Sequence, residues 1–254
     1  MSDKHGYPTA SMLIIGNEIL SGRTQDTNLK YLAETLLTKG IRMMEVRVVP
    51  DDESTIIASL NELRAKSTYT FTTGGIGPTH DDITAECIAK AFGVPLELNA
   101  RARDILLGYY GSEDQLTEPR LKMAHIPVGA DLILNPVSGA PGFHIGNVFV
   151  MAGVPKIMQA MVDDILPRLS TGAKILSHSV SCDLGESMMA LQLTAIQNKY
   201  PDIEIGSYPQ YRAGALGVSL VARGTDQAHI TGAVDDIKTM ILSLGGNITA
   251  ELVS

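Results

Sequence analysis

Long apolar runs are missing from this 254-residue sequence, and cysteine is nearly missing. No stretch approaches the roughly 18 consecutive apolar residues that a membrane-spanning helix needs, so the sequence predicts no membrane span. The first ten residues include Asp3, Lys4 and Pro8 and have no apolar core, so we expect no signal peptide. The two cysteines, Cys87 and Cys182, lie far apart without a partner pattern. We interpret them as packing residues of a reducing compartment and expect a cytoplasmic protein.

Basic residues are also scarce, since 20 Lys and Arg stand against 28 Asp and Glu and give a formal net charge of −8. Affinity for nucleic-acid backbones and anionic membranes comes from Lys and Arg, so neither partner is expected. The composition, 44% hydrophobic and 19% charged, is typical of a globular protein with a core. Its length suits one large domain or a large and a small one.

Two common kinds of catalytic motif are absent from the sequence. The six histidines show no metal-ligand spacing. Only His80, beside two aspartates, is a candidate for a site, and an exposed residue without function is the alternative. Ser21 lacks a Gly-x-Ser-x-Gly context, so acyl-enzyme chemistry is not predicted.

A glycine-rich segment with two aspartates is the most informative feature that is present. Residues 72–84 read TTGGIGPTHDDIT and follow a short β-type run. Because Gly74, Gly75 and Gly77 have no side chains, a ligand can approach the backbone closely. A turn between a strand and the start of a helix directs backbone N–H groups at an anion. We predict that this turn, together with Thr79, binds phosphate.

Asp81 and Asp82 are unusual in a phosphate-binding turn, because like charges repel. A divalent cation or a proton transfer between protein and phosphate removes this conflict. Helix capping needs one carboxylate at most, and Thr84 is itself a candidate N-cap for the next helix. The sequence therefore favours a functional role for the aspartate pair.

Apolar periodicity predicts two domains. Residues 12–92 follow the order β-α-β-α-β-α, which is typical of a mainly parallel sheet with helices on both faces. After a boundary near residues 167–172 the order becomes β-α-β-β-α-β, the split pattern of small α+β domains. We predict an α/β domain over residues 1–170 and a small α+β domain over residues 171–254, with loops at residues 16–22 and 139–143.

Polar residues gather after the strands of the first domain, where open parallel sheets bind ligands. The candidates there are Asn17, Glu18, Asp26, Asn28, Asp51, Asp52, Asp81 and Asp82. We expect Asn17, Glu18 and Asn28 to contact substrate. Asp26, Asp81 and Asp82 are predicted to hold a hard cation such as Mg²⁺.

Each of these assignments has a plainer alternative. A helix cap would equally explain Asp26, and a cap with a solvated surface is the preferred interpretation of Asp51 and Asp52. Arg120 and Lys122 could reach phosphates from the side, and surface charge is the alternative for both.

Several motifs resemble a known family. Residues 72–84 resemble the signature of the molybdopterin-binding domain of molybdenum-cofactor biosynthesis proteins, MoaB and Mog. The fuller resemblance, over about residues 10 to 250, is to the N-terminal part of the competence/damage-inducible protein A family. Its matching motifs are Gly16, Glu18 to Leu20, Gly22, Asp26, Asn28, Ala140 to Phe143 and Gly153 to Pro155. The second domain, with Gly185 to Ser187 and Gly206 to Pro209, resembles that family and the hydrolase half of eukaryotic FAD synthase.

The resemblance implies a three-layer α/β/α sandwich that binds a pterin or a nucleotide pyrophosphate at the glycine turn. It implies Asp82 as the catalytic or metal-binding carboxylate, with Asp81 beside it. The implied activity is hydrolysis of an ADP-ribose-like or FAD-like pyrophosphate with Mg²⁺, Mn²⁺ or Co²⁺, and K⁺ as a further candidate ion. The alternatives are a molybdopterin-binding module that cleaves nothing and an inactive scaffold. A homodimer is also implied.

Some positions depart from the family pattern. His80 stands where an acidic residue or proline is common, Met151-Ala152 replaces Leu-Pro, and the Asn-containing segment near Arg120 is only loosely kept. These departures bear on the substrate more than on the fold. Because the sequence ends at Ser254 without the amidohydrolase domain, nicotinamide-nucleotide deamidation is not expected.

Overall fold

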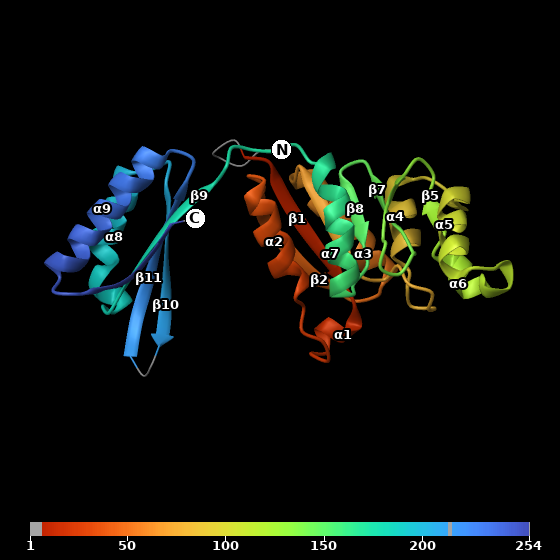
Figure 1. Cartoon of the computed structure of the whole chain (residues 1–254), viewed down its shortest axis with the longest axis horizontal. Coiled ribbons are helices and arrows are strands. Elements are labelled where there is room, and N and C mark those ends of the chain that lie inside the picture. Colours follow the sequence, from red (N-terminus) through yellow and green to blue (C-terminus); the bar gives the residue numbers. More distant parts are fainter. Residues whose placement is uncertain (1–6, 213–214, 254) are drawn as a thin grey trace. The chain divides into compact units, whose positions relative to one another are not determined.

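The computed structural model describes residues 7–212 and 215–253 and divides into two compact units, Met1–Gly172 and Ala173–Ser254 (Figure 1). Residues 1–6, part of the N-terminal stretch in which no signal peptide is expected, lie outside the described residues. No helix among those described combines the length and the apolar character needed to cross a membrane.

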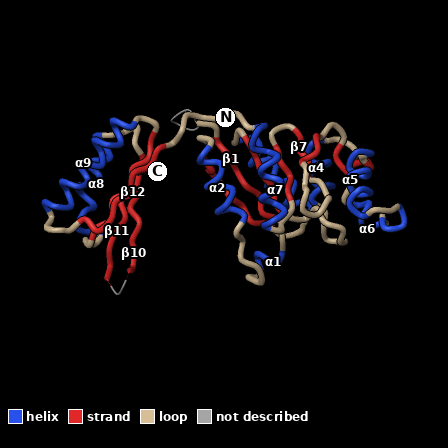
Figure 2. Tube along the Cα trace, viewed as in Figure 1, coloured by secondary structure: helices blue, strands red, loops and turns tan. Residues whose placement is uncertain are grey.

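The first unit alternates helices with the strands of one main sheet (Figure 2). Its strands are β1 (Thr9–Ile15), β2 (Arg42–Val49), β3 (Tyr69–Thr73), β4 (Leu96–Leu98), β5 (His125–Pro127), β6 (Asp131–Ile133), β7 (Gly142–Ile145) and β8 (Val148–Met151). Its α-helices are α1 (Asn17–Leu20), α2 (Asn28–Thr38), α3 (Glu53–Lys66), α4 (Thr84–Phe92), α5 (Ala100–Tyr110), α6 (Glu118–Lys122) and α7 (Pro155–Ile165). Two 3-10 turns, η1 (Glu113–Gln115) and η2 (Leu166–Arg168), complete it.

The main sheet has the strand order β2-β1-β3-β8-β7-β6. The first four strands pair in parallel, and β7 joins β8 and β6 in antiparallel pairs. The predicted three-layer, mainly parallel α/β fold is confirmed. β4 and β5 form a separate antiparallel pair.

Every residue of β1 is buried, which explains why this strand reads as a continuous apolar run. Side chains alternate between the two faces of a strand. Leu13 and Ile15 accordingly join the core under α3 and α4, and Met12 and Ile14 join the core under α2 and α7. The two cores lie between the main sheet and the helices on each of its faces, and this arrangement makes the three layers.

Two stretches expected to be loops contain regular structure. Residues 17–20 form the short helix α1, and Gly142 begins the strand β7. A Cβ on Gly142 would lie 2.3 Å from the carbonyl oxygen of Val150, so glycine allows β7 to approach β8 closely.

The second unit contains β9 (Leu176–Cys182), α8 (Glu186–Lys199), β10 (Glu204–Arg212), β11 (Ala215–Gly224), α9 (Gln227–Ser243) and β12 (Ile248–Val253). Its sheet has the order β10-β11-β9-β12, with antiparallel pairs. Val180, Leu220 and Ile237 are buried in its core, where the helices pack on the sheet. The small α+β fold is confirmed.

Candidate functional site

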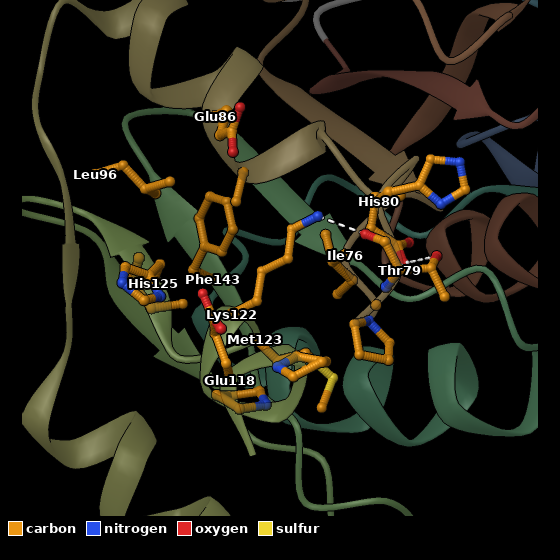
Figure 3. Close-up of a pocket in the computed structure, with 18 residues that line it drawn as sticks. Ile76, Thr79, His80, Glu86, Leu96, Glu118, Lys122, Met123, His125 and Phe143 are labelled. Atoms are coloured by element: carbon orange, nitrogen blue, oxygen red, sulfur yellow. Dashed lines mark hydrogen bonds between the residues drawn. The ribbon is translucent and has the colours of Figure 1, made fainter. Parts of the chain in front are cut away.

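A pocket of about 540 Å³ lies against the glycine turn of the first unit (Figure 3). Residues 75–80 and Asp82 line one side, and Glu118, Lys122 and His125 come from α6 and β5 on the other. Ile76, Leu96, Met123 and Phe143 add apolar surface. The pocket therefore combines a polar turn with an apolar wall.

The three glycines of the turn are required for three different close approaches. Gly74 has φ 99°, and a Cβ there would lie 2.1 Å from the carbonyl oxygen of Ile15. Gly75 has φ 66°, and its Cβ would lie 2.3 Å from Thr84 Oγ1. A Cβ on Gly77 would lie 2.7 Å from Asp82 Oδ2. The turn thus packs on β1 and folds around the Asp82 carboxylate.

Thr84 does not cap α4, so that prediction is wrong. The N-cap residue is Ile83, and no side-chain cap bond is formed. Thr84 Oγ1 instead donates to the carbonyl oxygen of Gly74 at 2.9 Å, and Thr84 N donates to the carbonyl oxygen of Gly75 at 2.9 Å. The helix start closes the turn.

Thr79 orients both aspartates. Its backbone N–H donates to Asp82 Oδ2 at 2.8 Å. Its Oγ1 lies 2.5 Å from Asp81 Oδ1 and 2.6 Å from Asp82 Oδ2, so its single hydrogen serves one carboxylate at a time. The Thr79 hydroxyl, followed by the backbone N–H of Asp81, lowers the pKa of the Asp81 carboxyl below its usual value.

Lys122 reaches across the larger pocket from α6 (Figure 3). Its Nζ donates to the carbonyl oxygen of Thr79 at 2.5 Å. The ammonium group therefore lies beside the turn that carries Asp81 and Asp82, where it can also meet an anionic ligand.

A smaller cavity of about 50 Å³ is lined by Glu18, Asp26, Asn28, Thr73 and Gly153, among other residues. The N-cap residue of α2 is Thr27, and Asp26 Oδ1, one residue earlier, accepts from the backbone N–H of Leu29 in the first turn of the helix at 2.9 Å. Asn28 Nδ2 donates to the carbonyl oxygen of Gly153 at 2.7 Å.

The expected site residues are divided between these two cavities. The larger is lined by Gly75, Gly77, Thr79, Asp82 and Lys122, and the smaller by Glu18, Asp26 and Asn28. Gly74 stands between Thr73 of the smaller cavity and Gly75 of the larger. Over residues 7–212 and 215–253, no three His, Cys, Asp or Glu gather in a group that could hold a metal ion.

The remaining candidates are engaged elsewhere. Asn17 N donates to Asp51 Oδ2 at 3.0 Å. Arg120 stacks over the Tyr110 ring at 4.0 Å and donates to the carbonyl oxygen of Gln115 at 2.6 Å. Asn17, Asp81 and Arg120 line neither cavity.

Asp52 behaves as the sequence suggests. It caps α3 by accepting from Thr55 N at 2.9 Å. The hydroxyl of Thr55, then that of Ser54, lowers the pKa of Asp52 to about 2.

The apolar wall was not predicted from the sequence. Leu96 begins the three-residue strand β4, and Met123 follows the five-residue helix α6, and segments as short as these show no hydrophobic period. The sequence points to Phe143 only as the last residue of the Ala-Pro-Gly-Phe motif.

A family model described as the probable molybdopterin binding domain matches residues 11–171, which is more than half of the chain. The chain belongs to this molybdopterin-binding domain family. A second model, the FAD synthase middle domain, matches residues 174–244.

Similar proteins support the same placement. The crystal structure of the protein CinA, of unknown function, from Thermoplasma acidophilum is 37% identical, with a TM-score of 0.60. It covers 64% of this chain and 98% of its own chain. A protein of Archaeoglobus fulgidus is 33% identical over 230 residues, which are 91% of this chain and 96% of its own. The resemblance to the competence/damage-inducible protein family is confirmed.

Proposed function

We propose that this protein hydrolyses a nucleotide pyrophosphate of the ADP-ribose or FAD type with the help of a divalent cation. The observation that carries the proposal is the fixed position of Asp82 at the edge of a ligand-sized pocket. Its carboxylate faces Thr79 N, Thr79 Oγ1 and the bare Cα of Gly77. A pocket of about 540 Å³ lies within the range of small-molecule sites.

The two sides of the pocket suit the two parts of a nucleotide. Ile76, Met123 and Phe143 offer apolar contact to a planar ring. The glycine turn and Lys122 offer backbone N–H groups and a positive charge to phosphate oxygens. A substrate with both parts would place its phosphates beside Asp82.

In this mechanism Asp82 orients a water molecule and accepts its proton as the oxygen attacks phosphorus. The P–O bond to the bridging oxygen breaks, and the two halves leave as phosphate monoesters such as AMP. Lys122 neutralises charge on the phosphate oxygens. A divalent cation would supply further neutralisation, and the carboxylates of Glu18 and Asp26, in the smaller cavity on the other side of Gly74, would hold it.

The second candidate function is a molybdopterin-binding module that cleaves nothing. The family match to a probable molybdopterin binding domain favours it, and the apolar wall of the pocket would accept a pterin ring as readily as another planar ring. Metal dependence separates the two functions, because a carrier could bind its ligand in EDTA whereas the hydrolase would be inactive.

A turnover screen tests the proposal. Purified protein would be incubated with ADP-ribose, FAD, NADH and dinucleoside polyphosphates, with Mg²⁺, Mn²⁺ or Co²⁺ and with or without K⁺, while AMP release is measured. We expect metal-dependent AMP release that Asp82→Asn lowers by about 10²-fold or more, with an unchanged melting temperature. If the variant hydrolyses as fast as the wild type, the role given to Asp82 is wrong. If the folded wild-type protein is inactive on every substrate, the pterin-binding function is favoured.

A further inference from the structure

The smaller cavity is lined by buried oxygen atoms that lack a partner. Asn28 is 4% exposed and Thr73 is 1% exposed. Among the described residues, neither Asn28 Oδ1 nor Thr73 Oγ1 has a hydrogen-bond partner. Buried polar atoms in folded proteins are nearly always satisfied, so an unpaired pair in one cavity points to a bound species.

The orientation of the Asn28 amide is fixed by the backbone. Because Nδ2 donates to the carbonyl oxygen of Gly153 at 2.7 Å, the other amide atom is the oxygen, and it can only accept a hydrogen bond or bind a cation. Asn28 begins α2 and Thr73 ends β3, so both oxygens are held by regular elements. Their positions do not depend on a loop.

Two carboxylates share the cavity with these oxygens. Asp26 Oδ1 accepts from the backbone N–H of Leu29, which leaves Oδ2 for another contact. The Glu18 carboxylate lies over Gly16, whose added Cβ would be 2.6 Å from both carboxylate oxygens. The described residues that line the cavity include no Lys, Arg or His, so no basic side chain there neutralises the two charges.

We propose that this cavity binds one divalent cation of the size of Mg²⁺ or Mn²⁺, through Asn28 Oδ1, Thr73 Oγ1 and the carboxylates of Glu18 and Asp26. Carboxylate, amide and hydroxyl oxygens are the ligands that such hard cations take. A volume of about 50 Å³ admits an ion with water and excludes a nucleotide ring.

This cation site differs from the set predicted from the sequence. It keeps Asp26 and replaces Asp81 and Asp82, whose carboxylates already share the hydroxyl of Thr79. Gly74 separates it from the larger pocket. A role of this cation in hydrolysis rests on the proposed function, whereas its binding does not.

The test is a titration with Mn²⁺ in the absence of any nucleotide, in which electron paramagnetic resonance measures the free ion. The variants are Glu18→Gln and Asp26→Asn. The new amide oxygen of Asp26→Asn can still accept from Leu29 N, so this hydrogen bond to the first turn of α2 is kept. The matched control is the double variant Asp81→Asn with Asp82→Asn on the other side of Gly74.

We expect one Mn²⁺ per chain in the wild type, and at least about tenfold weaker binding in each of the two variants. The control should bind as the wild type does. Mn²⁺ should also raise the melting temperature of the wild type and of the control more than that of either variant.

Three results would overturn the inference. They are no Mn²⁺ binding by the wild type, wild-type binding by both cavity variants, or loss of binding in the control. A protein that binds Mn²⁺ in the expected pattern but hydrolyses nothing would refute the proposed function and leave the cation site in place. Metal-dependent hydrolysis by a protein whose variants do not show the expected pattern of Mn²⁺ binding would support the proposed function and refute the cation site.

Discussion

Thr84 Oγ1 donates a 2.9 Å hydrogen bond to the carbonyl oxygen of Gly74, ten residues earlier in the chain. This bond joins the first turn of α4 to the end of β3, and the backbone bond from Thr84 N to Gly75 reinforces it. Asp82 lies inside the closed turn. The position of the candidate catalytic carboxylate therefore depends on a hydroxyl group that is fully buried.

Replacing Thr84 by valine keeps the shape of the side chain and removes the hydroxyl. We expect Thr84→Val to lower the free energy of unfolding by about 1 kcal/mol, because the Gly74 carbonyl loses a buried donor. Urea denaturation measures this as a lower midpoint with an unchanged slope. Thr84→Ser is the control and should retain most of the stability. Equal stability of the valine variant and the wild type would show that the bond contributes nothing.

Gly77 leaves room for Asp82, and Ala at this position would remove that room. The added Cβ would lie 2.7 Å from Asp82 Oδ2, so the carboxylate must shift. A misplaced catalytic group can cost about 10²-fold in turnover, and we expect such a loss in Gly77→Ala with little change in melting temperature.

Gly108→Ala is the matched control for this substitution. Gly108 lies within α5, and nothing lies within 4 Å of its added Cβ. Alanine should stabilise the helix by about 0.5–1 kcal/mol and leave turnover unchanged. If Gly77→Ala retains wild-type turnover on a substrate that the protein hydrolyses, the fixed position of Asp82 does not matter for catalysis.

Much of the fold could be predicted from local sequence signals. The order β-α-β-α-β-α predicted over residues 12–92 matches β1, α2, β2, α3, β3 and α4. The helix α7 begins at Pro155, because proline is favoured in the first turn of a helix. The element α6 and the strand β5 were missed. They have five and three residues and form through tertiary contacts, such as the pairing of β5 with β4.

The site was predictable only as a set of residues at one edge of a sheet. The sequence places Asp26 and Asp82 after parallel strands, but it does not show that Gly74 packs on Ile15 and divides the edge into two cavities. That division depends on a contact between two strands that are distant in the sequence. The same limit applies to Arg120, whose partners Tyr110 and Gln115 follow from the packing of α5 with α6.

Lys122 and Arg120 both lie in α6 and carry the same charge, but their surroundings differ, so they should respond differently to substitution. Lys122→Met should raise KM for a pyrophosphate substrate by about tenfold, since one charged contact to phosphate is lost. Arg120→Met should leave KM unchanged and lower stability by about 0.5–1 kcal/mol, through loss of the contact with Tyr110. Steady-state kinetics and thermal melts of both variants measure this. A larger KM effect in Arg120→Met than in Lys122→Met would restore Arg120 as the phosphate ligand.

The two thiols should be inert in the folded protein. Both Cys87 and Cys182 are buried, and burial, followed by the charge of Glu53, raises the pKa of Cys87 to about 12. At pH 8 only about one Cys87 thiol in 10⁴ would be ionised, and the thiolate is the reactive form. A chromogenic disulfide reagent at pH 8 should therefore report no fast-reacting thiol in the native protein and two per chain in guanidinium chloride. Rapid reaction of one native thiol, assigned with Cys87→Ser, would instead show that the core under α4 opens to solvent.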